Sequence, residues 1–214
     1  MRKIILIISI VVFITSNSNA QNGRTDLRSK LMFGVKAGLN YSNVYDSEGE
    51  NFNSNPRVGF VTGAFMSVPI GRYIGIQPEF LFSQRGFQAT GGSLTGSYNF
   101  TRITDNIDVP LLFAFKPSEF LTLLAGPQYS YLMKRRDEFA NETTTIEQEK
   151  QFDNDNIRKN ILCFTGGLDL TLKRFVFSAR VGWAVQKNNG DGTSSTPRYK
   201  DVWYQTTVGY RFYR

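Results

Sequence analysis

The side chains in this sequence that could do chemistry are single charges, spaced along segments that are otherwise small and polar. Glu79 and Asp108 are the most suggestive, since two neighbouring carboxylates can share acid–base work in hydrolysis. The same two groups could instead bracket a Lys or Arg, and no other feature of the sequence favours catalysis. The charges expected on these polar faces are Lys36, Glu79, Asp108, Lys116, Asp169, Lys173, Arg180 and Arg211.

The composition excludes several classes of active site. The chain of 214 residues has no His and a single Cys, Cys163. It therefore cannot form a Ser-His-Asp triad, a His-activated Cys nucleophile, a His metal site or an internal disulfide. Asp153-Asn-Asp-Asn156 has the opening spacing of a calcium loop, but it lacks the required Gly and the closing Glu. We therefore expect no catalytic residue, no metal and no cofactor.

The N-terminus has the three-part layout of an export signal. Two basic residues precede an apolar run of 11 residues, Ile4 to Ile14, and Ser18-Asn19-Ala20 has the small-x-small pattern of a cleavage site. The apolar run is too short for a spanning helix, which needs about 20 residues. We expect a cleaved signal peptide at residues 1–20, a short periplasmic segment at 21–31 and one domain at 32–214.

The charge of the exported chain is mild. Removal of Arg2 and Lys3 lowers the basic count from 25 to 23 against 18 acidic residues, which leaves a net charge of +5. This balance does not suggest a nucleic-acid partner.

The remainder of the chain alternates apolar and polar residues with period two. In Phe33–Tyr41 the odd positions are apolar and the even positions are Gly, Lys or Asn, which is typical of a two-faced strand. Seven more segments of this kind span residues 58–68, 74–83, 106–116, 121–131, 162–173, 175–185 and 202–212. Eight such strands predict an all-β fold, an eight-stranded antiparallel up-and-down transmembrane β-barrel in the bacterial outer membrane.

The connections between these segments alternate in length. Four are long and polar, and we expect them to be outer loops: residues 45–55, 86–97, 134–156 and 186–199. The three between them are short, at residues 69–72, 116–119 and 173–174. Outer-membrane barrels have this asymmetry of short periplasmic turns and long outer loops, whereas a soluble sandwich has no reason to show it.

The two faces of the strands predict an inverted barrel. The apolar face should contact lipid, because the polar face has too few charges and too much Gly for a solvated exterior. The lumen charges should then neutralise one another, since an eight-stranded interior is just wide enough for side chains; the alternative is a polar pathway or binding site. Ring residues near the strand ends predict an interfacial girdle: Tyr41, Tyr73, Tyr129, Tyr131, Trp183, Trp203, Tyr204 and Tyr210.

Four segments, in this order, resemble the PorT-like or "porin family" outer-membrane barrels of Gram-negative bacteria. They are Gly34-Val-Lys-Ala-Gly-Leu-Asn-Tyr-Ser42, Gln77-Pro-Glu-Phe-Leu-Phe-Ser-Gln-Arg-Gly86, Ile107-Asp-Val-Pro-Leu-Leu-Phe-Ala-Phe-Lys116 and Leu124-Ala-Gly-Pro-Gln-Tyr-Ser-Tyr-Leu132. The resemblance covers about residues 32–212 and implies an eight-stranded barrel. The best-known member is needed for secretion and gliding motility, and most members have no assigned activity. The C-terminus departs from barrels that end on an aromatic residue, because Arg214 follows Tyr213.

These observations favour a non-enzymatic barrel that is a scaffold or a component of a cell-envelope or secretion assembly. Its partners would be outer-membrane lipid and envelope proteins that dock on the outer loops. Passive transport of small solutes is an alternative, although open pores are wider barrels of about 16–18 strands. Surface adhesion through the long loops, or an enzyme of unrecognised type, are further alternatives.

Overall fold

The chain folds almost entirely into antiparallel strands, as a computed structural model shows for residues 27–48, 53–93, 96–141, 144–150, 158–189 and 198–212. A short 3-10 helix, η1 (Leu27–Ser29), comes first. The strands that follow are β1 (Met32–Glu48), β2 (Asn53–Pro69), β3 (Ile74–Ser93), β4 (Gly96–Phe115), β5 (Leu121–Asn141), β6 (Thr144–Lys150), β7 (Asn160–Leu172), β8 (Phe175–Ala184) and β9 (Arg198–Phe212). The predicted signal peptide, residues 1–20, lies outside the described residues.

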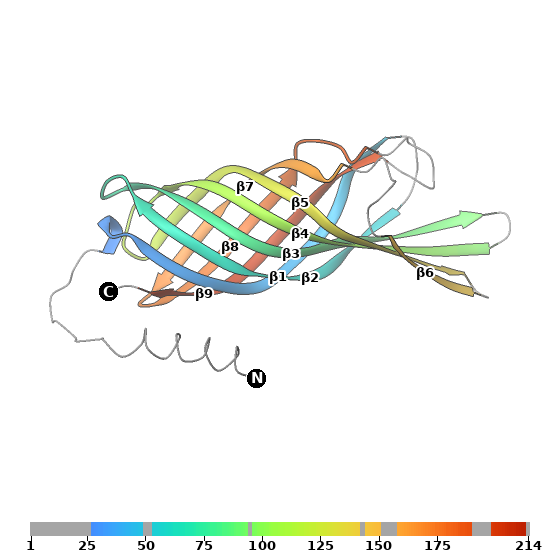
Figure 1. The fold of residues 1–214 in the computed structure, drawn as a ribbon, viewed down its shortest axis with the longest axis horizontal. Coiled ribbons are helices and arrows are strands. Elements are labelled where there is room, and N and C mark those ends of the chain that lie inside the picture. The colour runs from blue at the N-terminus through green and yellow to red at the C-terminus, as the bar shows by residue number, and fades with distance from the viewer. Residues whose placement is uncertain are drawn as a thin grey trace.

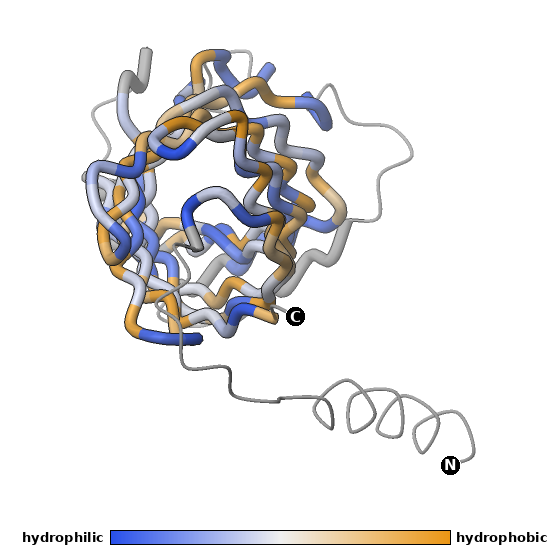
Figure 2. Tube along the Cα trace, turned by 90° about the vertical axis from the view of Figure 1, so that its left-hand side faces the viewer, coloured by the Kyte–Doolittle hydropathy of each residue, from blue (hydrophilic) through white to orange (hydrophobic). Residues whose placement is uncertain are grey.

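Eight of these strands, all except β6, close into a barrel. Hydrogen bonding runs in the order β4-β3-β2-β1-β9-β8-β7-β5, and a further pairing of β4 with β5 completes the ring. Each neighbouring pair is antiparallel, and β1 meets β9 in a register that places Val35 opposite Tyr210. Figure 1 shows the tilted strands from the side, and Figure 2 shows the closed ring from its end. The predicted eight-stranded antiparallel barrel is thus confirmed.

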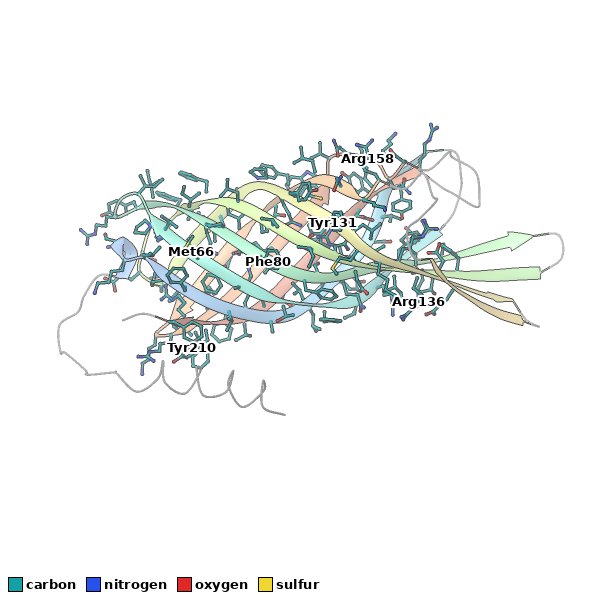
Figure 3. The ribbon with its side chains drawn as sticks, in the orientation of Figure 1. Met66, Phe80, Tyr131, Arg136, Arg158 and Tyr210 are labelled. Atoms are coloured by element: carbon teal, nitrogen blue, oxygen red, sulfur yellow. The ribbon has the colours of Figure 1, made fainter. Side chains whose placement is uncertain are left out.

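The barrel is apolar outside and polar inside. Val35, Phe80 and Leu111 are 48%, 59% and 52% exposed on the outer surface, and Figure 3 shows Phe80 among the outward side chains. Polar residues of the alternate positions are buried, as for Asn40 and Ser83, whose side chains hydrogen-bond across the lumen at 2.9 Å. Such a surface suits lipid, where only a closed sheet satisfies all backbone groups of a strand.

Across the part of the chain that the structure describes, no helix is long and apolar enough to cross a membrane.

Several strands continue well past the apolar band, so the predicted outer loops at 45–55, 86–97 and 134–156 were too long. β3 and β4 have 20 residues each and β5 has 21, about twice the 9–11 that cross a bilayer. Beyond the barrel, β5 leaves β7 and pairs with β6 (Figure 1). Past the apolar band the outer face is no longer apolar, but inward positions such as Arg85 and Phe87 stay buried and backbone pairing continues. In the fourth loop, residues 190–197 lie outside the described residues.

One close approach in the lumen depends on a glycine. Gly182 of β8 lies opposite Trp203 of β9 in the ladder. A Cβ atom at Gly182 would lie 2.2 Å from the indole ring of Trp203, so the ring occupies the space that a side chain would need. Trp203 is 1% exposed.

We predict that Gly182→Leu destabilises the folded barrel by about 1–3 kcal/mol, the usual cost of overpacking a filled interior. The temperature at which the unboiled protein loses its faster mobility on a detergent gel should fall. Gly71→Ala is the matched control, because nothing lies within 4 Å of a Cβ at Gly71. An unchanged transition for Gly182→Leu would contradict this account of the Trp203 site.

Candidate functional site

Four charged side chains and one amide form the centre of the lumen. The Lys36 ammonium of β1 pairs with Glu79 of β3, and Arg180 of β8 lies 2.7 Å from an Asp169 oxygen of β7 and 3.6 Å from Glu79. The Gln77 amide bridges the two carboxylates, donating to Glu79 at 2.9 Å and to Asp169 at 3.1 Å. Two cations and two anions balance, which low-dielectric burial requires. We call this group the central network.

A second ion pair lies further along the lumen and carries an aromatic ring. Arg85 of β3 pairs with Asp108 of β4, and its guanidinium lies 3.6 Å from the centre of the Trp203 ring. The other oxygen of Asp108 accepts a hydrogen bond from Ser130 at 2.7 Å. Ser130 also contacts the buried Cys163 thiol, at 3.6 Å. Cys163 is therefore packed within this layer rather than presented to solvent.

The lumen near β6 is filled by a third charged group and by apolar side chains. Arg102 donates to both oxygens of Asp137, at 2.8 and 3.0 Å, and to the Tyr199 hydroxyl at 3.0 Å. Arg135 also binds Asp137. Burial opposes ionisation of Asp137, yet these hydrogen bonds hold its pKa below the usual range. Asp137 lies beyond Met133, the last outward apolar residue of β5. The packed apolar residues are Val44, Phe87, Ala89, Phe100 and Tyr199.

The opposite mouth of the barrel is covered by the segment before β1. Lys116 donates to the Arg28 carbonyl at 3.2 Å and to the Ser67 hydroxyl at 3.0 Å. The Arg28 guanidinium lies 5.1 Å from the centre of the Tyr73 ring, and the Arg28 residue itself is buried. A cavity of about 20 Å³ remains between Arg28, Lys116 and the central network, which is room for roughly one water molecule.

The charged residues predicted for the lumen lie there with one exception. Lys36, Glu79, Asp108, Lys116, Asp169, Arg180 and Arg211 are all buried. The prediction for Lys173 was wrong, because it lies exposed in the β7–β8 turn with a φ of 56°. A two-residue turn needs a left-handed backbone there, which carries the side chain out of the ladder.

The two carboxylates that could have formed an acid–base pair are held separately. Glu79 contacts Lys36 and Arg180, whereas Asp108 contacts Arg85 and Ser130. Each therefore acts as the counter-ion of its own cation, the arrangement that the sequence left open as the alternative.

The predicted girdle residues divide between the two ends of the barrel, again with one exception. Tyr41, Tyr129, Tyr131, Trp183 and Tyr204 are exposed toward the β6 end, and Tyr73 and Tyr210 lie at the other end. Trp203 is buried in the lumen, so its placement in the girdle was wrong. It has the same parity along β9 as Gln205 and Thr207, which are also buried. Strand parity therefore assigns Trp203 to the lumen, whereas its residue type suggested the girdle.

Sequence reasoning missed the charges beyond the apolar band. Arg85, Arg102, Arg135 and Asp137 are buried in the lumen, yet all four fall in segments read as loops or outside any predicted strand. The available signal was the continued alternation past Ser83: Arg85 and Phe87 keep the inward parity, and both are buried.

A match to a protein family agrees with this polar lumen and apolar exterior. A family model described as "Outer membrane protein beta-barrel domain" matches residues 19–189. This chain belongs to that family. The barrel accordingly lies in the cell outer membrane, with its apolar surface in lipid.

Solved barrels of several bacteria are similar in fold at low identity. Ail, the attachment invasion locus protein of Yersinia pestis, is 18% identical with a TM-score of 0.47, over 85% of this chain and 98% of that one. OprG from Pseudomonas aeruginosa is 14% identical with a TM-score of 0.47, over 87% and 98%. Neisserial surface protein A is 12% identical with a TM-score of 0.46, over 83% and 96%. No curated protein matches the sequence.

The central network generates a prediction about stability. Glu79→Gln leaves Lys36 and Arg180 with one carboxylate instead of two, so we expect the free energy of unfolding to fall by about 3–5 kcal/mol. Urea unfolding of the outer-membrane barrel in detergent, followed by Trp fluorescence, measures the change.

The matched control restores the charge balance. Lys36→Met combined with Glu79→Gln removes one cation and one anion, and it leaves Arg180 with Asp169. This double variant should be more stable than Glu79→Gln alone. If its free energy of unfolding falls by the sum of the decreases that Lys36→Met and Glu79→Gln cause singly, the two side chains do not act as a pair.

Proposed function

We propose that this outer-membrane barrel is a non-conducting, non-enzymatic scaffold, which docks a protein of a cell-envelope assembly through the sheet beyond its barrel. The observation that carries the proposal is the position of β6. It is the last strand in the sheet order, and among the described residues it pairs only with β5. Its other edge offers backbone N–H and C=O groups, to which an extended segment of a partner can add as a new strand.

The shape of the sheet beyond the barrel supports docking. Between β3 and β4 the ladder continues to Ser93 opposite Gly96, and between β4 and β5 it reaches Asn99 opposite Ala140. These strands and β6 therefore make one continuous sheet past the apolar band (Figure 1). A sheet tied to a closed barrel loses little conformational freedom when a partner binds, which favours affinity. The resemblance to PorT-like barrels supports an envelope or secretion assembly as the setting.

The filled lumen supports a role without solute flux. From one end to the other, buried side chains occupy successive layers: Lys116, the central network, the Arg85–Asp108 pair with Trp203, and the Arg102–Asp137 pair beneath Phe87 and Phe100. Eight-stranded barrels are just wide enough for such filling, whereas porins of 16–18 strands hold a channel. Small-solute transport is thus the weaker candidate.

Three observations support a role without catalysis. The sequence has no His, and each buried carboxylate of the central network has a cationic partner. Among the residues that the structure describes, no three His, Cys, Asp or Glu side chains lie together as a metal site would need.

Bilayer recording tests the claim that the barrel does not conduct. Protein reconstituted into a planar bilayer should give no current steps above background, because the charged layers leave no continuous aqueous path. A porin of about 16 strands in the same lipid serves as the positive control for insertion. Reproducible current steps from the purified barrel would favour the transport alternative.

Deletion of β6 tests the docking proposal. Removal of residues 142–156 should abolish recovery of the crosslinked envelope partner after crosslinking in cells and purification from outer membranes. Removal of residues 190–197, in the connection between β8 and β9, is the matched control and should leave recovery intact. Both variants should keep the heat-dependent gel shift of a closed barrel. Undiminished recovery without residues 142–156 would overturn the docking role of β6, and loss of binding to cell surfaces instead would favour adhesion.

A further inference from the structure

Cationic side chains line one side of the outer rim, where β5, β7, β8 and β9 leave the apolar band. Among the partly or fully exposed ones are Lys134, Arg158, Lys187, Arg198 and Lys200. They alternate with inward neighbours, since Arg135 beside Lys134 is buried and Tyr199 between Arg198 and Lys200 is buried. We call these five residues the cationic rim.

Backbone and side-chain contacts place these residues on adjacent strands. The Leu132 amide of β5 donates to the Lys159 carbonyl at 2.8 Å, which brings Lys134 beside the start of β7. Arg158 donates two hydrogen bonds to the Asn189 side chain, at 3.2 and 3.0 Å. The Asn188 amide donates to the Tyr199 carbonyl at 3.1 Å. The rim is therefore a continuous arc across four strands.

The opposite side of the same end has a different character. Among the described side chains of β2, β3 and β4, the outward polar residues at this level include Asn55, Gln84, Gln88 and Thr101. Asp105 of β4 also faces outward, but it lies directly opposite Lys134 in the β4–β5 ladder and so borders the rim. Arg57 of β2 lies opposite Ser42, a buried lumen residue, and so faces inward. The five cations of the rim thus lie on the half of the circumference formed by β5, β7, β8 and β9, with Asp105 opposite Lys134 at its border.

An aromatic belt lies directly below the rim. Tyr131 of β5, Trp183 of β8 and Tyr204 of β9 are 42%, 37% and 55% exposed, and the Lys200 ammonium lies 5.8 Å from the centre of the Tyr45 ring. Figure 3 shows Tyr131 and Arg158 at the same end of the barrel. Tyr and Trp side chains mark the level of the lipid headgroups. Lys134, Lys187 and Lys200 lie three or four positions from these rings in the sequence, and Arg198 lies six from Tyr204, at roughly 3.3 Å per residue along a strand.

We propose that the cationic rim binds the phosphate groups of phosphorylated glycolipid in the outer leaflet. The aromatic rings below the rim would contact the first carbons of the acyl chains, while the Lys and Arg side chains of the rim reach the phosphates. The outer leaflet of a Gram-negative outer membrane is rich in such lipid, and the rim lies at its headgroup level. Charge-assisted hydrogen bonds to phosphate oxygens suit Arg and Lys in particular.

The test measures glycolipid retained by the purified full-length barrel. Protein is reconstituted in phosphatidylcholine nanodiscs with a small fraction of lipid A, either phosphorylated or enzymatically dephosphorylated. After mild detergent extraction, mass spectrometry gives the glycolipid bound per barrel. Phosphorylated lipid A should be retained at a level roughly tenfold or more above the dephosphorylated form. Equal retention of the two would overturn the proposal.

Variants assign the binding to the rim. Lys134→Gln, Arg158→Gln and Lys187→Gln together should remove most of the retained lipid A, while the heat-dependent gel shift persists. Lys30→Gln with Arg72→Gln, two exposed cations at the other end, is the matched control and should retain it. Undiminished retention in the triple variant would overturn the proposal. Displacement of lipid A by excess inorganic phosphate would instead identify a site for small anions.

Discussion

The pairing of β1 with β9 is the constraint on which the rest of this molecule depends. It joins the first barrel strand to the last, so no row of unpaired backbone groups faces lipid. Closure at eight strands also sets the width of the interior. Every inward side chain must then fit a narrow space in which an uncompensated charge is costly. The glycine at position 182, the ion pairs and the aromatic residues of the lumen all follow from this limit.

The lumen is filled by successive layers of charged and apolar side chains. The central network contains two cations and two anions, and the Arg85–Asp108 pair is covered by the Trp203 ring. Ion pairs of this kind contribute less to stability than their number suggests, because desolvation offsets much of their attraction. They compensate the buried charges and fill the space between the strands. A barrel filled in this way presents its distinguishing chemistry at its ends, on the rim and on the sheet that continues past it.

Much of the membrane-embedded structure could be predicted from the period-two alternation of the sequence. Lipid on one side of each strand and a packed lumen on the other impose opposite residue types on alternate positions. Seven of the eight predicted lumen charges are buried for that reason. The same reasoning failed beyond the membrane, where lipid no longer contacts the outer face. Past the apolar band the outer face meets water instead of lipid, so the contrast between the two faces weakens, and strands such as β6 were read as loop. Trp203 was misassigned because its residue type was given more weight than its parity in the strand.

The sequence by itself determined the number of barrel strands, the membrane-facing side of each of them and the absence of His-based chemistry, since these depend on local pattern and composition. Only the tertiary structure decided which charges pair, because Lys36 and Glu79 of β1 and β3 are far in the chain from Asp169 and Arg180 of β7 and β8. It alone also decided that Lys173 turns out of the lumen and that β6, among the described residues, pairs along one edge with β5. Pairing across the ring depends on register and closure, which no local segment encodes.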